Sequence, residues 1–149
     1  MGDPESTTTL ARIDVRSPFF GLNFPIPARH AHGAENLSPP VRWTRVPANT
    51  RTFALLREDS DAAGADPFVH WLIYDIPGRL NELPEGLHDP KPEEVPGSSQ
   101  GVNDFGEIGY GGPEPPAGSG AHRYVFRLYA VDRVLRLQPG TRSGTCSTP

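Results

Sequence analysis

Proline and glycine are the residues that most restrict how this chain can fold. The sequence holds 18 prolines and 16 glycines among 149 residues, roughly twice their combined share of about 12% in average proteins. Proline removes a backbone donor and fixes φ, and glycine is entropically costly inside a helix. Because both recur along nearly the whole length, a helical bundle or a coiled coil is excluded.

Short apolar runs between these residues predict strands. Their period-two alternation and their aromatic and β-branched residues favour extended structure. The segment 122–131 also fits a helical stripe through Tyr124, Leu128 and Val131, but its composition favours a strand. We expect a mainly β fold with strands near 13–17, 41–43, 52–56, 68–76 and 122–131, and loops over 21–40, 87–100 and 101–120.

Length indicates a single domain with an irregular segment at each end. A chain of this size can bury about 70% of its unfolded surface but is too short for two ordinary domains. We expect a flexible tail over 1–11, one domain over 12–140 and an irregular tail over 141–149.

Charge and cysteine content exclude several classes of partner. The formal net charge is −4 with no block of Lys or Arg, which argues against binding to a nucleic-acid backbone. The single Cys146 allows neither an intramolecular disulfide nor a cysteine-based zinc site. No signal-peptide pattern and no run of about 18 apolar residues is present. We therefore expect a cytoplasmic protein with no membrane span.

Titratable residues gather where the expected strands begin and end. Asp59 and Asp61 follow one strand, His70 lies in the next, and His122 and Tyr124 open a third. By themselves the two aspartates are typical of turns and His70 is typical of a buried core histidine. The sequence contains no phosphate-binding glycine loop, GxSxG elbow or HExxH motif. His70, His122 and Asp59 could also form a facial metal triad, which is a less favoured interpretation.

The order of short motifs along about residues 13–140 resembles the phosphatidylethanolamine-binding protein (PEBP) family, and within it the prokaryotic Raf kinase inhibitor-like branch. These motifs are Ile26-Pro27, Gly33, Asn36-Leu-Ser-Pro-Pro40, Trp43, Pro47, Asp59-Ser-Asp61, His70-Trp71, Ile76-Pro77, Gly101-Val-Asn-Asp-Phe-Gly106, Gly109-Tyr110, Gly112-Pro-Glu-Pro-Pro116 and His122-Arg-Tyr124. Each motif is weak alone, but the ordered series is highly specific.

The resemblance implies a β-sandwich with a large antiparallel sheet, few short helices and a small surface pocket for phosphate-type anions or a phospholipid head group. The pocket residues that it implies are Asp59, Asp61, His70, Pro113, Pro115, Pro116, His122 and Tyr124. Two imidazoles and a phenol can donate to an oxyanion, and a carboxylate beside a histidine favours its charged form. We expect at least one cis X-Pro bond within residues 112–116.

Three features depart from the family pattern. Ser60 and Ala63 stand where many relatives have prolines, and His32 stands where relatives place an aspartate. Relatives also continue into a C-terminal, usually helical segment, whereas this chain ends in the polar residues 141–149. We therefore expect a looser Asp59–Ala63 loop and no C-terminal helix.

The favoured functional hypothesis is a binding module without catalytic residues, cofactor or metal, with a regulatory role toward a protein partner. The alternatives are a hydrolase that uses the Asp and His pocket, and a protein-interaction factor of the kinase-inhibitor type. Exposed strands also allow a homodimer. If protonated His70 and His122 hold the anion, its affinity falls across roughly pH 6–8.

Overall fold

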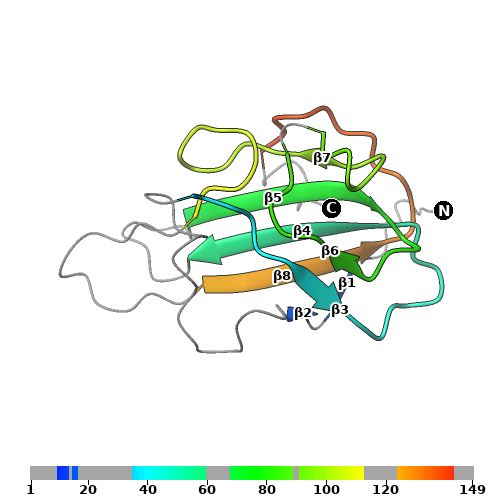
Figure 1. Ribbon diagram of the computed structural model, residues 1–149. Coiled ribbons are helices and arrows are strands. Elements are labelled where there is room, and N and C mark those ends of the chain that lie inside the picture. The colour runs from blue at the N-terminus through cyan, green and yellow to red at the C-terminus, as the bar shows by residue number, and fades with distance from the viewer. Residues whose placement is uncertain are drawn as a thin grey trace.

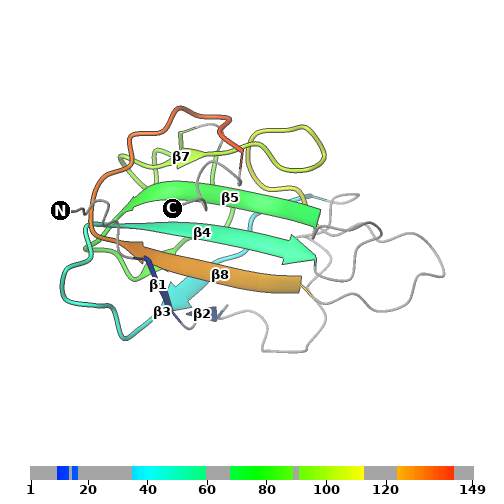
Figure 2. The ribbon, with the colours of Figure 1, turned by 180° about the vertical axis from the view of Figure 1, so that it is seen from behind.

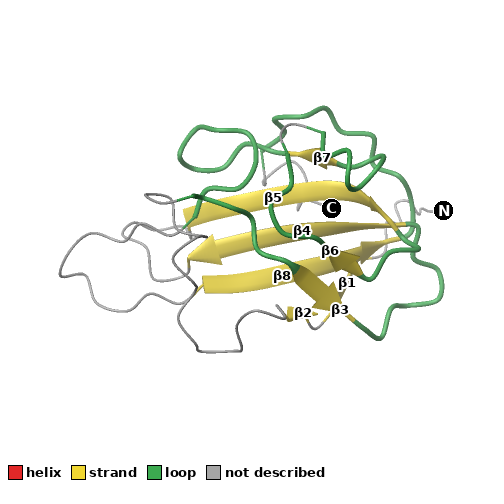
Figure 3. Ribbon diagram, in the orientation of Figure 1, coloured by secondary structure: helices red, strands yellow, loops and turns green. Residues whose placement is uncertain are grey.

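The computed structural model describes residues 10–13, 15–16, 35–59, 68–88, 91–112 and 124–142 (Figure 1). Figure 3 shows strands and loops only, and none of the described residues is helical. Within these ranges there is accordingly no helix long and apolar enough to cross a membrane. The strands are β1 (Leu10–Ile13), β2 (Val15–Arg16), β3 (Val41–Trp43), β4 (Thr52–Asp59), β5 (Phe68–Pro77), β6 (Glu82–Leu83), β7 (Ser99–Gln100) and β8 (Tyr124–Val131).

The strands form two antiparallel sheets. The larger has the order β1-β8-β4-β5-β7 and the smaller has the order β2-β3-β6. Strands β3 and β6 lie in front of the larger sheet in Figure 1, and β3 lies behind it in the reverse view of Figure 2. The small sheet therefore covers one face of the large sheet, as the predicted sandwich requires.

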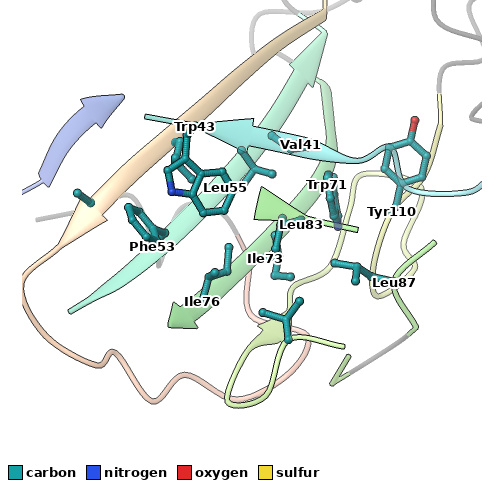
Figure 4. Close-up of a cluster of buried hydrophobic side chains, with 13 residues drawn as sticks. Val41, Trp43, Phe53, Leu55, Trp71, Ile73, Ile76, Leu83, Leu87 and Tyr110 are labelled. Carbon is teal, nitrogen blue, oxygen red and sulfur yellow. The ribbon is translucent and has the colours of Figure 1, made fainter. Parts of the chain in front are cut away.

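The main core lies between the two sheets (Figure 4). Trp43 of β3 meets Phe53 of β4 edge to face, with ring centroids 5.0 Å apart. The buried indole of Trp71 donates from Nε1 to Oε1 of Gln100 at 2.6 Å, so its polar atom is satisfied. Burial of a large aromatic side chain contributes roughly 2–3 kcal/mol. The cluster consists of Val41, Trp43, Phe53, Leu55, Trp71, Ile73, Ile76, Leu83, Leu87, Val95, Tyr110, Leu128 and Ala130.

The other face of the large sheet is covered by the C-terminal segment 134–142. Leu135 and Leu137 of this segment pack on a second cluster, formed by Ala54, Leu56, Val69, Leu72 and Tyr74. The Tyr74 hydroxyl donates to the carbonyl of Gln138. The Asp75 carboxylate accepts the backbone N–H groups of Leu135 and Arg136 at 2.7 and 2.8 Å. Hydrogen bonds from the side chains of Tyr74 and Asp75 therefore hold this segment against the sheet, although the segment is not itself a strand.

The mainly β prediction is confirmed, and its boundaries change in several places. Strands β3, β4, β5 and β8 occupy the expected regions, although β4 continues to Asp59. The expected strand 13–17 was wrong in its limits. Pairing of β1 with β8 begins at Leu10, inside the expected tail, and β2 belongs to the other sheet. Ser99 and Gln100, expected in a loop, pair with β5.

Candidate functional site

Three of the eight residues expected at the site, Asp59, His70 and Tyr124, lie at one end of the three central strands. In the strand register Asp59 lies opposite Phe68 of β5 on one side and opposite Tyr124 of β8 on the other. His70 is two residues further along β5. Asp61, Pro113, Pro115, Pro116 and His122, together with the expected cis bond, lie outside the described residues.

A break in the register of β5 determines where His70 points. Arg57 pairs with Trp71, but the next residue, Glu58, pairs with Val69, so His70 is an extra residue on β5. Such a bulge places two consecutive side chains on one face of a sheet. Here the two are His70 and Trp71, and Trp71 belongs to the main core. The Val69 side chain accordingly packs in the second cluster with Ala54.

Alternation along β4 then identifies the face that His70 shares. Phe53 and Leu55 point toward the small sheet as members of the main core, and Arg57 and Asp59 follow them at period two. The ring of His70 lies 4.9 Å from that of Phe68. The bulge therefore brings His70 to the same face as Arg57 and Asp59, whereas strict alternation from Trp71 would send it to the opposite face.

The His70 ring is fixed by the loop 101–112. Its Nδ1 donates to the carbonyl oxygen of Gly111 at 2.7 Å, and the backbone N–H of Gly111 donates to the His70 carbonyl at 2.8 Å. The Phe105 ring packs edge to face against the imidazole at 5.6 Å. A Cβ on Gly111 would come within 2.5 Å of a Phe105 ring carbon, so a larger residue at this position would displace the Phe105 ring.

Two polar side chains shape that loop and tie it to β5. The Asn103 Oδ1 accepts the N–H groups of Phe105 and Glu107, at 2.9 and 3.1 Å, and its Nδ2 donates to Gly109. Asp104 accepts the Val69 N–H at 2.7 Å and donates its own N–H to the Val69 carbonyl. The loop thus extends the edge of the sheet beside β5.

A third side chain closes the loop from a distant part of the sequence. Asn36 accepts the Gly112 N–H at 2.7 Å and donates to the Tyr110 carbonyl at 3.2 Å. The motif series contains Asn36 and the Gly101–Gly106 run, but sequence reasoning assigned no role to either. Their role is to hold the Gly111 carbonyl in reach of His70.

Burial controls the protonation of His70. The residue is 3% exposed, and burial lowers its pKa below the ordinary value of about 6.5, with the positive charge of Arg57 adding to this effect. The hydrogen bond to Gly111 and the charge of Asp59 act in the opposite direction and are outweighed. The ring is therefore neutral at pH 7, with its proton on Nδ1 and its lone pair on Nε2. Asp59 favours the charged ring, as expected from the sequence, but burial outweighs it.

Arg57 is a second feature of the site that the sequence did not indicate. Its side chain is 0% exposed, and Nη1 donates to the Tyr110 hydroxyl at 2.6 Å. The guanidinium carbon lies 5.1 Å from the ring centroid of Phe126, within cation–π range. Burial raises the pKa of Tyr110, and Arg57 opposes that shift.

The metal-site alternative gains no support from the described part of the chain. No group of three His, Cys, Asp or Glu side chains in these ranges is placed to hold an ion. The facial triad considered above includes His122, which lies outside them.

Comparison with known proteins agrees with this architecture. A protein of Methanothermobacter thermautotrophicus named "UPF0098 protein" is 47% identical over 129 residues, covering 86% of this chain and 82% of the relative. A protein of the same name from Aquifex aeolicus is 43% identical over 131 residues, covering 87% and 75%. The crystal structure of Escherichia coli YbcL, described as a new member of the mammalian PEBP family, superposes with a TM-score of 0.81 at 30% identity. That superposition covers 91% of this chain and 86% of YbcL.

The family profile described as phosphatidylethanolamine-binding protein matches residues 16–146. With the sandwich, the motif series and these relatives, the match shows that the chain belongs to the phosphatidylethanolamine-binding protein family.

Proposed function

We propose that this protein binds a small phosphate-type anion, such as inorganic phosphate or a phospholipid head group, at the end of β4, β5 and β8. The observation that carries the proposal is the bulge that turns His70 to the face of Asp59. We call this group, His70 with Asp59 and the Gly111 loop, the anion site. Family membership supports the assignment.

The chemistry of His70 supports a proton-linked mode of binding. Because Nδ1 is engaged by Gly111, a ligand oxygen would be met by Nε2, which must carry a proton in order to donate. An oxyanion stabilises the imidazolium, so binding at neutral pH takes up a proton. Asp59 favours the same charged form. Affinity therefore falls as pH rises through the pKa that His70 has in the complex.

Binding, without chemical turnover, fits the arrangement of the site best. The imidazole donates to the Gly111 carbonyl, the His70 backbone is bonded to the same glycine, and the ring packs against Phe68 and Phe105, which also contact each other. A rigid donor of this kind reduces the ordering cost of binding. A regulatory role toward a protein partner, a homodimer and a cytoplasmic location stay predictions from the sequence.

Isothermal titration with inorganic phosphate and with phosphorylethanolamine tests the proposal. His70→Asn keeps a donor in the position of Nδ1 for Gly111 and removes Nε2. We expect it to stay folded and to lose about ten- to hundredfold in affinity, the value of a charge-assisted hydrogen bond. His88→Asn is the matched control because the His88 side chain is 81% exposed and pairs with Glu94. Equal affinities of the wild type and the His70 variant would contradict the assignment.

A further inference from the structure

The anion site contains a physical conflict. Asp59 is 4% exposed and lies on the face proposed to receive an anion, where its negative charge would repel the ligand. His70 does not offset this charge in the unliganded protein because burial keeps the ring neutral at pH 7. A permanent positive charge on that face would attract the anion and oppose the repulsion from Asp59.

The described strand ends offer two arginines, and they lie on opposite faces of the sheet. Arg127 donates from Nε to Oε1 of Glu58 at 2.9 Å. Glu58 follows Leu56 at period two and so faces the second cluster, away from the anion site. These two charges compensate each other there. Arg57, in contrast, alternates with Glu58 and points to the face of Asp59 and His70.

Arg57 is connected to the site through its register partner on β5 and through the contacts of its guanidinium. Its partner in the register is Trp71, the residue beside His70 in the bulge. Its guanidinium is held by the hydroxyl of Tyr110 and by the ring of Phe126, and Tyr110 directly precedes the Gly111 that binds His70. A guanidinium keeps its charge at all relevant pH values and is costly to bury.

We propose that Arg57 determines the charge specificity of the anion site: its buried guanidinium offsets Asp59 and makes the site favour doubly charged over singly charged anions. This inference rests on the proposed function. At an effective dielectric constant of about 20 and a separation of about 10 Å, one unit charge changes affinity roughly tenfold for each charge on the ligand. A role limited to bracing the loop would affect all anions equally.

The test compares two anions whose charge does not change near neutral pH, sulfate (doubly charged) and dimethyl phosphate (singly charged). Calorimetry at pH 7 uses the wild type, Arg57→Met, Arg57→Lys and Tyr110→Phe. We expect Arg57→Met to lose roughly tenfold for dimethyl phosphate and roughly a hundredfold for sulfate. Arg57→Lys keeps the charge and should keep the preference for sulfate. Tyr110→Phe removes only the hydrogen bond between Arg57 and the loop, and it should weaken the binding of both anions by the same factor.

The outcomes separate the role of Arg57 from the existence of the anion site. If the wild type binds and Arg57→Met loses the same factor for both anions, or loses nothing, the assignment of Arg57 is overturned while the anion site stands. If the wild type binds neither anion, the proposed function fails and this inference fails with it. Arg57→Gln replaces the Met variant if that protein does not fold, because glutamine keeps a polar end near Tyr110.

The pKa of His70 gives a second test of the Arg57 charge that needs no ligand. Removal of the Arg57 charge should raise the pKa of His70, measured by NMR titration of its ring, because Arg57 lowers it. Tyr110→Phe keeps the charge and should leave that pKa close to the wild-type value. An unchanged His70 titration in folded Arg57→Met would contradict the inference.

Discussion

Replacement of Gly111 by alanine tests whether close packing against the loop 101–112 holds His70 in place. The added Cβ would lie 2.5 and 2.8 Å from two carbons of the Phe105 ring and 3.1 Å from Nδ2 of Asn103. Phe105 cannot simply turn away, because it packs edge to face on Phe68 at 4.9 Å and on His70 at 5.6 Å. Overpacking of this kind costs about 1–3 kcal/mol. Loss of the buried His70 to Gly111 hydrogen bond adds about 1 kcal/mol, so we expect a total loss of roughly 2–4 kcal/mol.

Gly106→Ala is the matched control in the same loop. Gly106 has φ +86°, and a Cβ at this position would meet no atom within 4 Å, so its replacement costs about 1–2 kcal/mol of backbone strain alone. Urea denaturation of both variants gives the two free energies of unfolding, and NMR of the ring gives the pKa of His70. We expect Gly111→Ala to be the less stable variant and to have a His70 pKa lowered further below 6.5, because the hydrogen bond to Gly111 raises that pKa. A smaller loss for Gly111→Ala than for Gly106→Ala, with an unchanged His70 titration, would refute the reasoning.

Three further predictions concern pH, the C-terminal segment and the second histidine. Because the pKa of His70 is lowered on folding, the unfolded chain binds more protons than the folded protein near pH 6. The free energy of unfolding should therefore decrease as pH falls below about 6.5. In denaturant titrations over about pH 7.5–5.5, His70→Asn should lose less stability than the wild type. Asp75→Asn should cost about 1.5–3 kcal/mol by weakening the bonds to Leu135 and Arg136, and faster hydrogen exchange of those two amides would identify the cause. His122→Ala should weaken phosphate binding about ten- to hundredfold in calorimetry, and unchanged affinity would place the ligand away from His122.

The sequence predicts the central strands because their apolar runs are continuous. Phe53 to Leu56 and Trp71 to Tyr74 are buried on both faces of the large sheet, so each run lacks polar positions and is too short for a typical helix. The short strands were harder to place. Leu10 and Ala11 are strand residues because they pair with β8, which is distant in sequence. A local sequence pattern cannot predict such pairing.

The geometry of the site depends on features that the local sequence does not encode. The bulge at His70 has no proline or glycine to mark it, and strict alternation places the ring on the wrong face. Arg57 would be expected at the surface, because arginine is rarely fully buried. A polar residue two positions before Asp59 on an apolar strand was the one available signal, because period two places both on the same face.

The protonation state of His70 with and without phosphate decides whether anion binding is linked to proton uptake at this ring. Nitrogen-15 NMR of the imidazole at pH 7 distinguishes a neutral ring protonated at Nδ1 from a ring protonated at both nitrogens. We predict the neutral form with Nδ1 protonated in the unliganded protein, because Nδ1 donates to Gly111. Saturating phosphate should convert His70 to the doubly protonated form and leave the exposed His88 unaffected. A His70 ring that stays neutral when phosphate is bound would contradict proton-linked binding.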